Sequence, residues 1–215
     1  MEPLVAAMFE TPLIVDMLPD YAALNAQLAD AIRARRAQDP AGISRSNRLG
    51  WHSDTAMASW GGPAIRPLLE RAVANANAQT IDIRPAGATP FGWQAEAWAN
   101  VTGRGASNQL HCHVGAFWAA VYYVDDGYGG SADAALGGEL VLEDPRMPAI
   151  LSEDPNLRLH ARPDDPLPEP EQHIRPRSGQ LLMIPGWLRH GVRPYLGDGQ
   201  RISIAINLTA IRPMA

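Results

Sequence analysis

The second half of this 215-residue chain reads as a series of short strands. Each segment is apolar or alternates between apolar and polar residues, and Gly, Pro, Asp or Asn residues bound it. The segments are residues 94–101, 109–114, 117–124, 139–143, 180–184 and 201–208. Short strands at close intervals favour a sandwich or barrel over a parallel sheet crossed by helices. We therefore expect a mainly β protein with flanking helices.

Residues 1–90 read as a mixed lead-in that is largely helical. A short strand is expected at residues 12–15. Apolar residues at four-residue spacing around Leu28 then predict a helix with one apolar face. A second helical pattern follows Pro63, and its regular part is expected to begin near Pro67, because a helix tolerates proline in its first turn.

A long segment rich in proline and charged residues, residues 147–178, interrupts the strands and holds many of the 19 prolines. A loop of this length inside a compact domain is usually functional or disordered, and we expect it to form a lid over an active site. No break in composition marks a second domain. We expect one domain over residues 1–215, with the barrel at 91–215.

Composition and charge exclude several classes of function. The formal net charge is −5, from 18 basic and 23 acidic residues, which argues against a nucleic-acid-binding protein. The apolar runs are shorter than the roughly 20 residues of a membrane span, and no basic segment precedes the first of them. Cys112 is the only cysteine, which fits a reducing compartment. We expect a cytoplasmic protein without membrane contact; its oligomeric state stays open, a homodimer included.

The motif His-Cys-His at residues 111–113 indicates a metal site. Residues i and i+2 of a strand project to the same face, so His111 and His113 would point inward together and Cys112 would turn away as a small buried residue. Such a pair suits a single metal ion, although the pattern is also common by chance. His190 follows an apolar strand and a Pro-Gly turn, where another strand would resume. We predict that His111, His113 and His190 bind one metal ion.

The last strand has one polar and one apolar face. The polar face carries Arg201, Ser203, Ala205 and Asn207, and the apolar face carries Ile202, Ile204, Ile206 and Leu208. A ligand-holding barrel strand shows this pattern, with its apolar side packed on helices. The planar guanidinium of Arg201 can bind a carboxylate through two hydrogen bonds, and the Ser203 hydroxyl lies beside it. The alternative is a surface arginine on an edge strand.

These motifs, in their order, resemble the core of the 2-oxoglutarate/Fe(II) oxygenases. The matching motifs are HxH at 111–113, Tyr-Tyr-Val at 122–124, Gly-Gly-Glu-Leu at 137–140, Pro-Gly-x-x-x-His at 185–190 and Arg-x-Ser at 201–203. The chain is also similar to a bacterial HxH subgroup of these oxygenases. That similarity lies at Ser46-Asn47, Gly50-Trp-His-Ser53, Val121-Tyr-Tyr-Val124, Asp144-Pro-Arg146 and Arg201-Ile-Ser-Ile-Ala-Ile-Asn207.

The resemblance implies a double-stranded β-helix, a jelly-roll or cupin-like barrel that binds Fe(II) and the cosubstrate 2-oxoglutarate. It implies that His111 and His190 bind the iron and that Arg201 with Ser203 binds the distal carboxylate of 2-oxoglutarate. Tyr123 would face the cosubstrate, with ordinary core packing as the alternative. The implied reaction is hydroxylation of a C–H bond in a small-molecule or peptide substrate that the sequence does not identify.

One position departs from the family pattern. The wider superfamily has His-x-Asp or His-x-Glu, and here His113 stands where that carboxylate would be. Three neutral imidazoles leave an Fe(II) site one negative charge short, which the two carboxylates of 2-oxoglutarate can offset. In the alternative, Glu96 or Glu139 approaches the metal instead. We favour His113.

Two other classes of function stay open at this point. A three-histidine metal cupin, a dioxygenase or an isomerase, would use the same barrel without 2-oxoglutarate. Cupins usually carry a glutamate a few residues after HxH, and residues 114–118 contain none. A non-catalytic ligand-binding barrel would explain the missing carboxylate at position 113, but it would not explain Arg201 and Ser203.

A few other side chains are weaker candidates. His52 is expected either to line the substrate cavity or to be a capping or surface histidine. The histidines at positions 160 and 173 lie in the proline-rich segment and are expected to be solvated. Trp98, Trp118 and Trp187 are interpreted as core or cavity wall.

Overall fold

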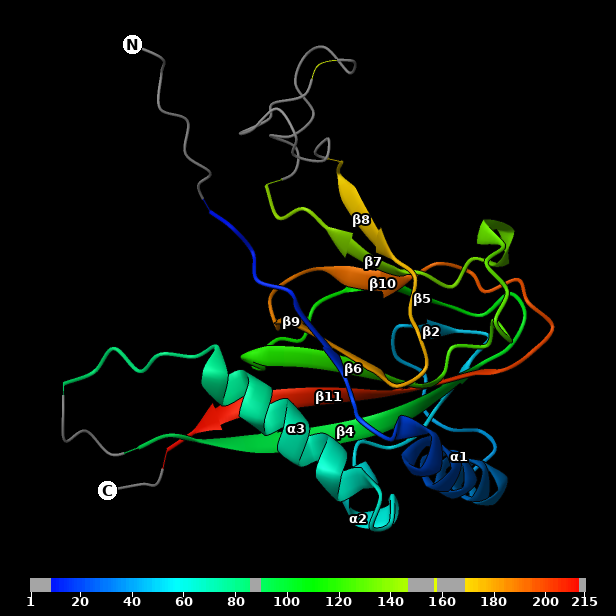
Figure 1. Ribbon diagram of the computed structural model, residues 1–215, viewed down its shortest axis with the longest axis horizontal. Coiled ribbons are helices and arrows are strands. Elements are labelled where there is room, and N and C mark those ends of the chain that lie inside the picture. Colours follow the sequence, from blue (N-terminus) through cyan, green and yellow to red (C-terminus); the bar gives the residue numbers. More distant parts are fainter. Residues whose placement is uncertain (1–8, 86–89, 147–156, 158–168, 213–215) are drawn as a thin grey trace.

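A computed structural model of the protein describes residues 9–85, 90–146, 157 and 169–212. These residues form two antiparallel sheets that lie one above the other, with helices below the larger sheet (Figure 1). The larger sheet has the strand order β1-β9-β6-β11-β4-β3, and the smaller sheet has the order β2-β5-β10-β7-β8. This arrangement confirms the prediction of a double-stranded β-helix with flanking helices.

The element bounds are as follows. The larger sheet contains β1 (Ile14–Met17), β9 (Gln180–Pro185), β6 (Trp118–Asp125), β11 (Arg201–Ile211), β4 (Gly92–Thr102) and β3 (Trp51–His52). The smaller sheet contains β2 (Asn47–Arg48), β5 (Ser107–His111), β10 (His190–Val192), β7 (Leu140–Glu143) and β8 (Glu171–Ile174). The helices are α1 (Tyr21–Gln38), α2 (Met57–Trp60) and α3 (Ile65–Ala78), with a short 3-10 helix, η1 (Ala134–Leu136).

The main core lies between the larger sheet and its helices. The apolar face of α1 contributes Leu28 and Ile32, and that of α3 contributes Leu68. They belong to the same buried cluster as Ile204 and Ile206 of β11. Burying one face of β11 in this way turns its alternate residues toward the smaller sheet. The predicted division of β11 into a helix-packed face and an inner face is therefore confirmed.

A second and smaller core lies between the two sheets. It is formed by β6, β7, β9 and the turn after β9, and its members include Tyr123, Leu140, Leu182 and Leu188. These residues close one part of the space between the sheets, and the rest of that space forms a cavity.

Several predicted boundaries differ from the structure. The helix α3 begins at Ile65, two residues before the expected start. Pro67 is still in the first turn, where a backbone N–H has no partner within the helix, so its missing N–H costs little. Strand β5 ends at His111 rather than at residue 114. The irregular polar segment at 44–53 contains the two-residue strands β2 and β3, which are too short to produce an alternating pattern.

The proline-rich segment is not irregular throughout. Its strand β8 pairs antiparallel with β7, with Ile174 opposite Leu140. The predicted lid falls largely on residues 147–156 and 158–168, which lie outside the described residues. The assignment of residues 1–215 to one domain stays a prediction. No helix in the described part of the chain has the length and hydrophobicity needed to cross a membrane.

Candidate functional site

Three histidines converge in the cavity between the sheets. The potential ligand atoms of His111, His113 and His190 all lie within 4.8 Å of one another. His111 ends β5, His190 begins β10, and the two are register partners on these adjacent strands. The Nε2 atoms of His111 and His113 are 3.2 Å apart. Within the described ranges, this is the group of side chains arranged to hold a metal ion.

Hydrogen bonds orient each imidazole ring. The Nδ1 atoms of His111 and His190 lie 2.7 and 2.9 Å from backbone carbonyl oxygens two residues earlier in the chain. A carbonyl can only accept, so each Nδ1 carries the proton and each Nε2 keeps its lone pair. The Nδ1 of His113 donates to Oδ1 of Asn207 on β11. All three rings are thus held in the tautomer that leaves Nε2 free to bind a metal.

Burial favours the neutral form of His113 and His190. Burial lowers the pKa of His190 to about 3. Burial also lowers the pKa of His113, although the hydrogen bond to Asn207 acts in the opposite direction. Because a metal binds the neutral form of imidazole, both side chains are ready to act as ligands at neutral pH.

His113 reaches this position from a turn rather than from a strand. The strand has already ended at His111, and the backbone N–H of His113 donates to the carbonyl of Gly186, at 2.8 Å. This bond ties the end of β5 to the turn between β9 and β10. Strand alternation therefore does not explain the pairing of His111 with His113. It also fails for Cys112, which was expected to be buried and is exposed.

Neither of the two glutamates considered as alternative ligands belongs to the histidine group. Glu96 is an exposed residue of β4 that lines the same cavity. Glu139 is buried next to β7, with its Oε2 3.9 Å from Nη1 of Arg193. The geometry therefore favours His113 over a carboxylate.

The other end of the cavity contains a buried arginine that has no counter-ion among the described residues. Arg201 is 4% exposed, and it forms no hydrogen bond or ion pair with the described residues. Its Cζ lies 5.8 Å from the ring centres of both Tyr123 and Tyr195. A buried guanidinium without an anion is energetically unfavourable, so this pocket is suited to an anionic ligand.

Two hydrogen-bond donors at this end lack partners. Nε of Arg201 and the hydroxyl of Tyr123 are buried without a hydrogen bond among the described residues. Burial raises the pKa of Tyr123 to about 12, so the hydroxyl stays protonated and can donate. Ser203 is the register partner of Tyr123 on the neighbouring strand. Together these groups fit one carboxylate.

Two glycines make room for Arg201. Gly127 and Gly138 have φ angles of +77° and +78°, which favour glycine over other residues. A Cβ on Gly127 would lie 2.4 Å from Cγ of Arg201, and a Cβ on Gly138 would lie 3.0 Å from its Nη1. Gly138, the second glycine of the Gly-Gly-Glu-Leu motif, thus leaves space for the guanidinium of Arg201.

Both ends open into one cavity of about 550 Å³. The three histidines, Arg201, Ser203 and Tyr123 all line it. So do apolar side chains such as Val121, Leu182 and Ile184. A metal at one end and a carboxylate at the other would share a single cavity.

His52 and Trp98 line the part of this cavity that extends away from the histidine group. The ring of Trp98 stacks on His113 and on His52, with a centroid distance of 5.6 Å in both cases. His52 is 5% exposed and lines the cavity, so the cavity alternative, and not the surface one, holds for this residue.

Residues 96–207, more than half of the chain, match the family described as "Putative 2OG-Fe(II) oxygenase". The chain belongs to this family. Membership makes the protein a 2-oxoglutarate- and Fe(II)-dependent oxygenase, with Fe(II) and 2-oxoglutarate as its metal and cosubstrate. No curated protein matches the sequence of this oxygenase.

Solved structures share the fold of the oxygenase at low identity. A prolyl-4-hydroxylase from Pseudomonas putida is 17% identical, with 95% of this chain and 94% of that chain covered and a TM-score of 0.57. A prolyl hydroxylase from Trichoplax adhaerens, solved with a peptide fragment, is 13% identical, with 92% and 83% covered and a TM-score of 0.62. HygX from Streptomyces hygroscopicus, with nickel and 2-oxoglutarate bound, is 14% identical, with 93% and 83% covered and a TM-score of 0.56.

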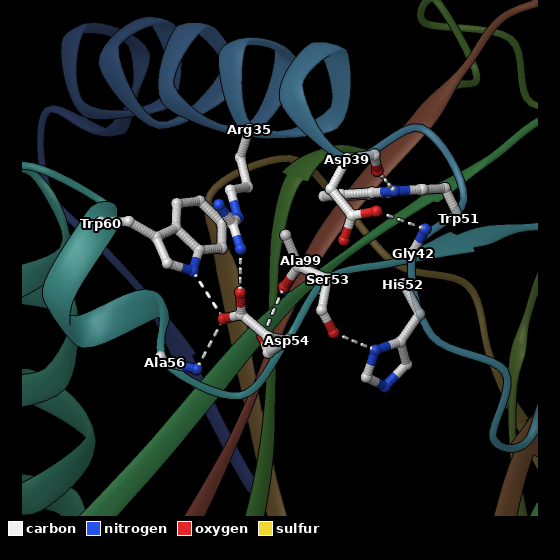
Figure 2. A network of polar contacts seen from close by, with 10 residues as sticks. All are labelled: Arg35, Asp39, Gly42, Trp51, His52, Ser53, Asp54, Ala56, Trp60 and Ala99. Atoms are coloured by element: carbon white, nitrogen blue, oxygen red, sulfur yellow. Dashed lines mark hydrogen bonds and ion pairs between the residues drawn. The ribbon is translucent and has the colours of Figure 1, made fainter.

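A polar network holds the His52 segment of the oxygenase against α1 and β4 (Figure 2). Asp54 accepts hydrogen bonds from Nε1 of Trp60 and the backbone N–H of Ala56, at 2.8 and 2.9 Å, and from Arg35 of α1. The backbone N–H of Ser53 donates to the carbonyl of Ala99 on β4, at 3.0 Å, and the Ala99 N–H donates to the Ser53 hydroxyl, at 2.9 Å. Sequence reasoning missed this network, because no local pattern places Arg35 beside Asp54.

The remaining candidates that the structure describes do not line the cavity of the oxygenase. His173 is exposed on β8, with Nε2 3.2 Å from Glu171, which agrees with the expected solvation. The histidine at position 160 lies outside the described residues. Trp118 is a core residue, as expected. Trp187 is 57% exposed, so its assignment to core or cavity wall was wrong.

Proposed function

We propose that this oxygenase hydroxylates a C–H bond of its substrate at the histidine end of the cavity. The metal ligands would be His111, His113 and His190, and the 2-oxoglutarate-binding residues would be Arg201, Ser203 and Tyr123. The observation that carries the proposal is that one cavity holds a three-histidine group and a buried arginine without a partner among the described residues.

The histidine end fits Fe(II) in its donor set and orientation. Each imidazole offers an Nε2 lone pair, and each Nδ1 is held by a hydrogen bond. When bound, Fe(II) and 2-oxoglutarate supply the oxidising power that inserts one atom of O2 into the substrate, with release of succinate and CO2. Three neutral ligands leave the +2 charge of the metal uncompensated, and the carboxylates of the cosubstrate offset it.

The arginine end fits the distal carboxylate of 2-oxoglutarate. The guanidinium of Arg201 and the hydroxyls of Tyr123 and Ser203 are donors on neighbouring strands. Arg201 and Tyr123 each have a buried donor atom that lacks a partner among the described residues. A carboxylate here would accept a hydrogen bond from both donors. A cupin without 2-oxoglutarate would leave them unsatisfied.

Apolar side chains and ring stacking surround the site. Apolar side chains from β6 and β9 line the cavity between its two ends. Trp98 stacks on the His113 ring and restricts its rotation. These features place apolar surface beside the reacting groups and limit the motion of the His113 ring.

Anaerobic addition of Fe(II) and then 2-oxoglutarate tests the assignment. The oxygenase should develop a weak visible charge-transfer band when 2-oxoglutarate is added, whereas a three-histidine cupin would bind iron without it and a pure binding module would show neither. With substrate and O2, we expect one equivalent of succinate and a product that carries one atom of labelled O2. A product without that label would contradict hydroxylation.

A further inference from the structure

One wall of the cavity is not used by the metal ligands or by the cosubstrate pocket. It is formed by β3 and β4, and it presents His52, Glu96, Trp98 and Asn100 to the cavity. Alternate residues of a strand share a face, which explains the three members on β4. His52 is the register partner of Asn100 on the adjacent strand, so the two polar side chains are neighbours.

His52 offers a hydrogen-bond acceptor of fixed direction. Its Nδ1 donates to the backbone carbonyl of Ser53, at 2.5 Å, so the proton is on Nδ1 and Nε2 keeps its lone pair. Nε2 has no hydrogen-bond partner in the described part of the chain. Figure 2 shows that this second ring nitrogen points away from the network that holds the segment. A neutral imidazole on a rigid support therefore faces the cavity.

Asn100 adds a second polar group without a partner. The residue is 9% exposed, and its Oδ1 is buried without a hydrogen bond among the described residues. Buried carboxamides are nearly always hydrogen-bonded, because an unpaired one loses the hydration that it has in the unfolded chain. Its place in the cavity wall indicates that a ligand supplies the missing bond.

Glu96 adds a negative charge to the same wall. It lies two residues before Trp98 on the cavity-facing side of β4, and within the described ranges it forms no ion pair. Its register partner on β11 is Asn207, which contacts His113, so this carboxylate lies on the histidine side of the cavity. The net charge of −5 also favours the approach of a cation over that of an anion.

We propose that the β3–β4 wall binds the substrate, that Glu96 binds a protonated amine or guanidinium of the substrate, and that His52 and Asn100 accept hydrogen bonds from a second polar group on the other side of Trp98. This inference rests on the proposed function, because it places the reacting carbon next to the histidine group. Arg45 is exposed at the same cavity and would face a carboxylate or carbonyl of the substrate. A lysine or arginine side chain, free or in a peptide, has both features.

Calorimetry on the anaerobic Fe(II)/2-oxoglutarate complex tests this assignment. The probes are the Nα-acetyl amides of lysine, arginine, norleucine and glutamate, of which norleucine matches the carbon chain of lysine without its charge. We expect one of the two cationic probes to bind at least about tenfold more tightly than the norleucine and glutamate probes, as for a charge-assisted hydrogen bond. Equal binding of all four, preference for a neutral or anionic probe, or no cationic binding at millimolar concentration would overturn the proposal.

Three variants then locate the binding group. Glu96→Gln should weaken the cationic probe about tenfold and leave the norleucine probe unchanged. His52→Phe keeps an aromatic ring on Trp98 but removes the hydrogen-bond acceptor. Asn100→Leu removes the unpaired amide and leaves the His52 ring in place. His173→Phe on exposed β8 is the matched control and should bind like the parent protein.

The charge-transfer band is recorded for every variant before calorimetry. A variant that keeps the band has an intact metal and cosubstrate site, so unchanged cation binding in all three such variants would overturn the wall assignment and leave the proposed function standing. Absence of the band in the parent protein would instead count against the proposed function, and the calorimetric ranking of the four probes would still decide the wall assignment.

Discussion

The two ends of the cavity differ in how completely the protein satisfies its own polar groups. At the histidine end, all three Nδ1 atoms have acceptors within the chain. At the arginine end, Nε of Arg201 and the hydroxyl of Tyr123 have none among the described residues. Hydrogen bonds within the chain orient the first end, whereas an anionic ligand would satisfy the donors at the second. Changes at the two ends should therefore affect different ligands.

Loss of a histidine should have the largest effect. His190→Ala removes one of the three proposed ligands, so Fe(II) affinity should fall by about 1,000-fold or more, and the affinity for 2-oxoglutarate in the presence of Fe(II) should fall with it. Anaerobic metal titration with Fe(II), and with Co(II) as a stable probe, measures this. His173→Ala, on exposed β8, is the control, and equal affinity of the two variants would remove His190 from the site.

Loss of the arginine should have a smaller effect, and that effect should be confined to binding of the cosubstrate. Arg201→Ala removes the charge that the distal carboxylate would meet, so 2-oxoglutarate affinity should fall about 100-fold, while Fe(II) affinity in its absence stays unchanged. The charge-transfer band, titrated against 2-oxoglutarate, reports both. Unchanged 2-oxoglutarate affinity would show that Arg201 is not its anchor.

Loss of an orienting hydrogen bond should have a still smaller effect on Fe(II) affinity. Asn207→Leu removes the acceptor for Nδ1 of His113, and Fe(II) affinity should fall about tenfold, which is typical of changes behind a metal ligand. Asn207→Asp keeps an acceptor and should retain the affinity. The Co(II) absorption spectrum and titration distinguish the two variants. Identical behaviour of the leucine and aspartate variants would mean that Asn207 does not position His113.

The smallest effect is the pH dependence of the free energy of unfolding of the metal-free protein. The folded-state pKa of His190 is about 3, below the ordinary value of 6.5, so between these values the unfolded chain binds more protons and stability falls with falling pH. From about pH 7 to pH 5.5 the free energy of unfolding should drop by about 1 kcal/mol from this residue. Urea unfolding at several pH values checks the slope, and His190→Gln should flatten it. A steeper slope in that variant would contradict the burial argument.

The residues that sequence patterns identify correctly share a physical basis. Alternation along β11 reports which side chains are buried against helices, so it separates Ile204 and Ile206 from the cavity-facing Arg201 and Ser203. The Pro-Gly turn before His190 marks where β10 begins. Both signals are local, since they depend on the pleat and on turn chemistry.

The partners of those residues depend on contacts between distant segments. Nothing in the sequence pairs His113 with Asn207, or places Tyr195 beside Arg201, because these contacts depend on strand order and register. Periodicity assigns a face to each strand, but it does not say which strand lies opposite. The position of His113 in a turn was missed for the same reason, since the bond that holds it goes to Gly186, in the distant turn between β9 and β10.

A crystal structure of the oxygenase grown anaerobically with Mn(II) and 2-oxoglutarate tests the central claim most directly. We expect one metal ion bonded to the Nε2 atoms of His111, His113 and His190, and the distal carboxylate within hydrogen-bond distance of Arg201. A metal ion bound by Glu96 in place of His113, or a carboxylate away from Arg201, would contradict the account.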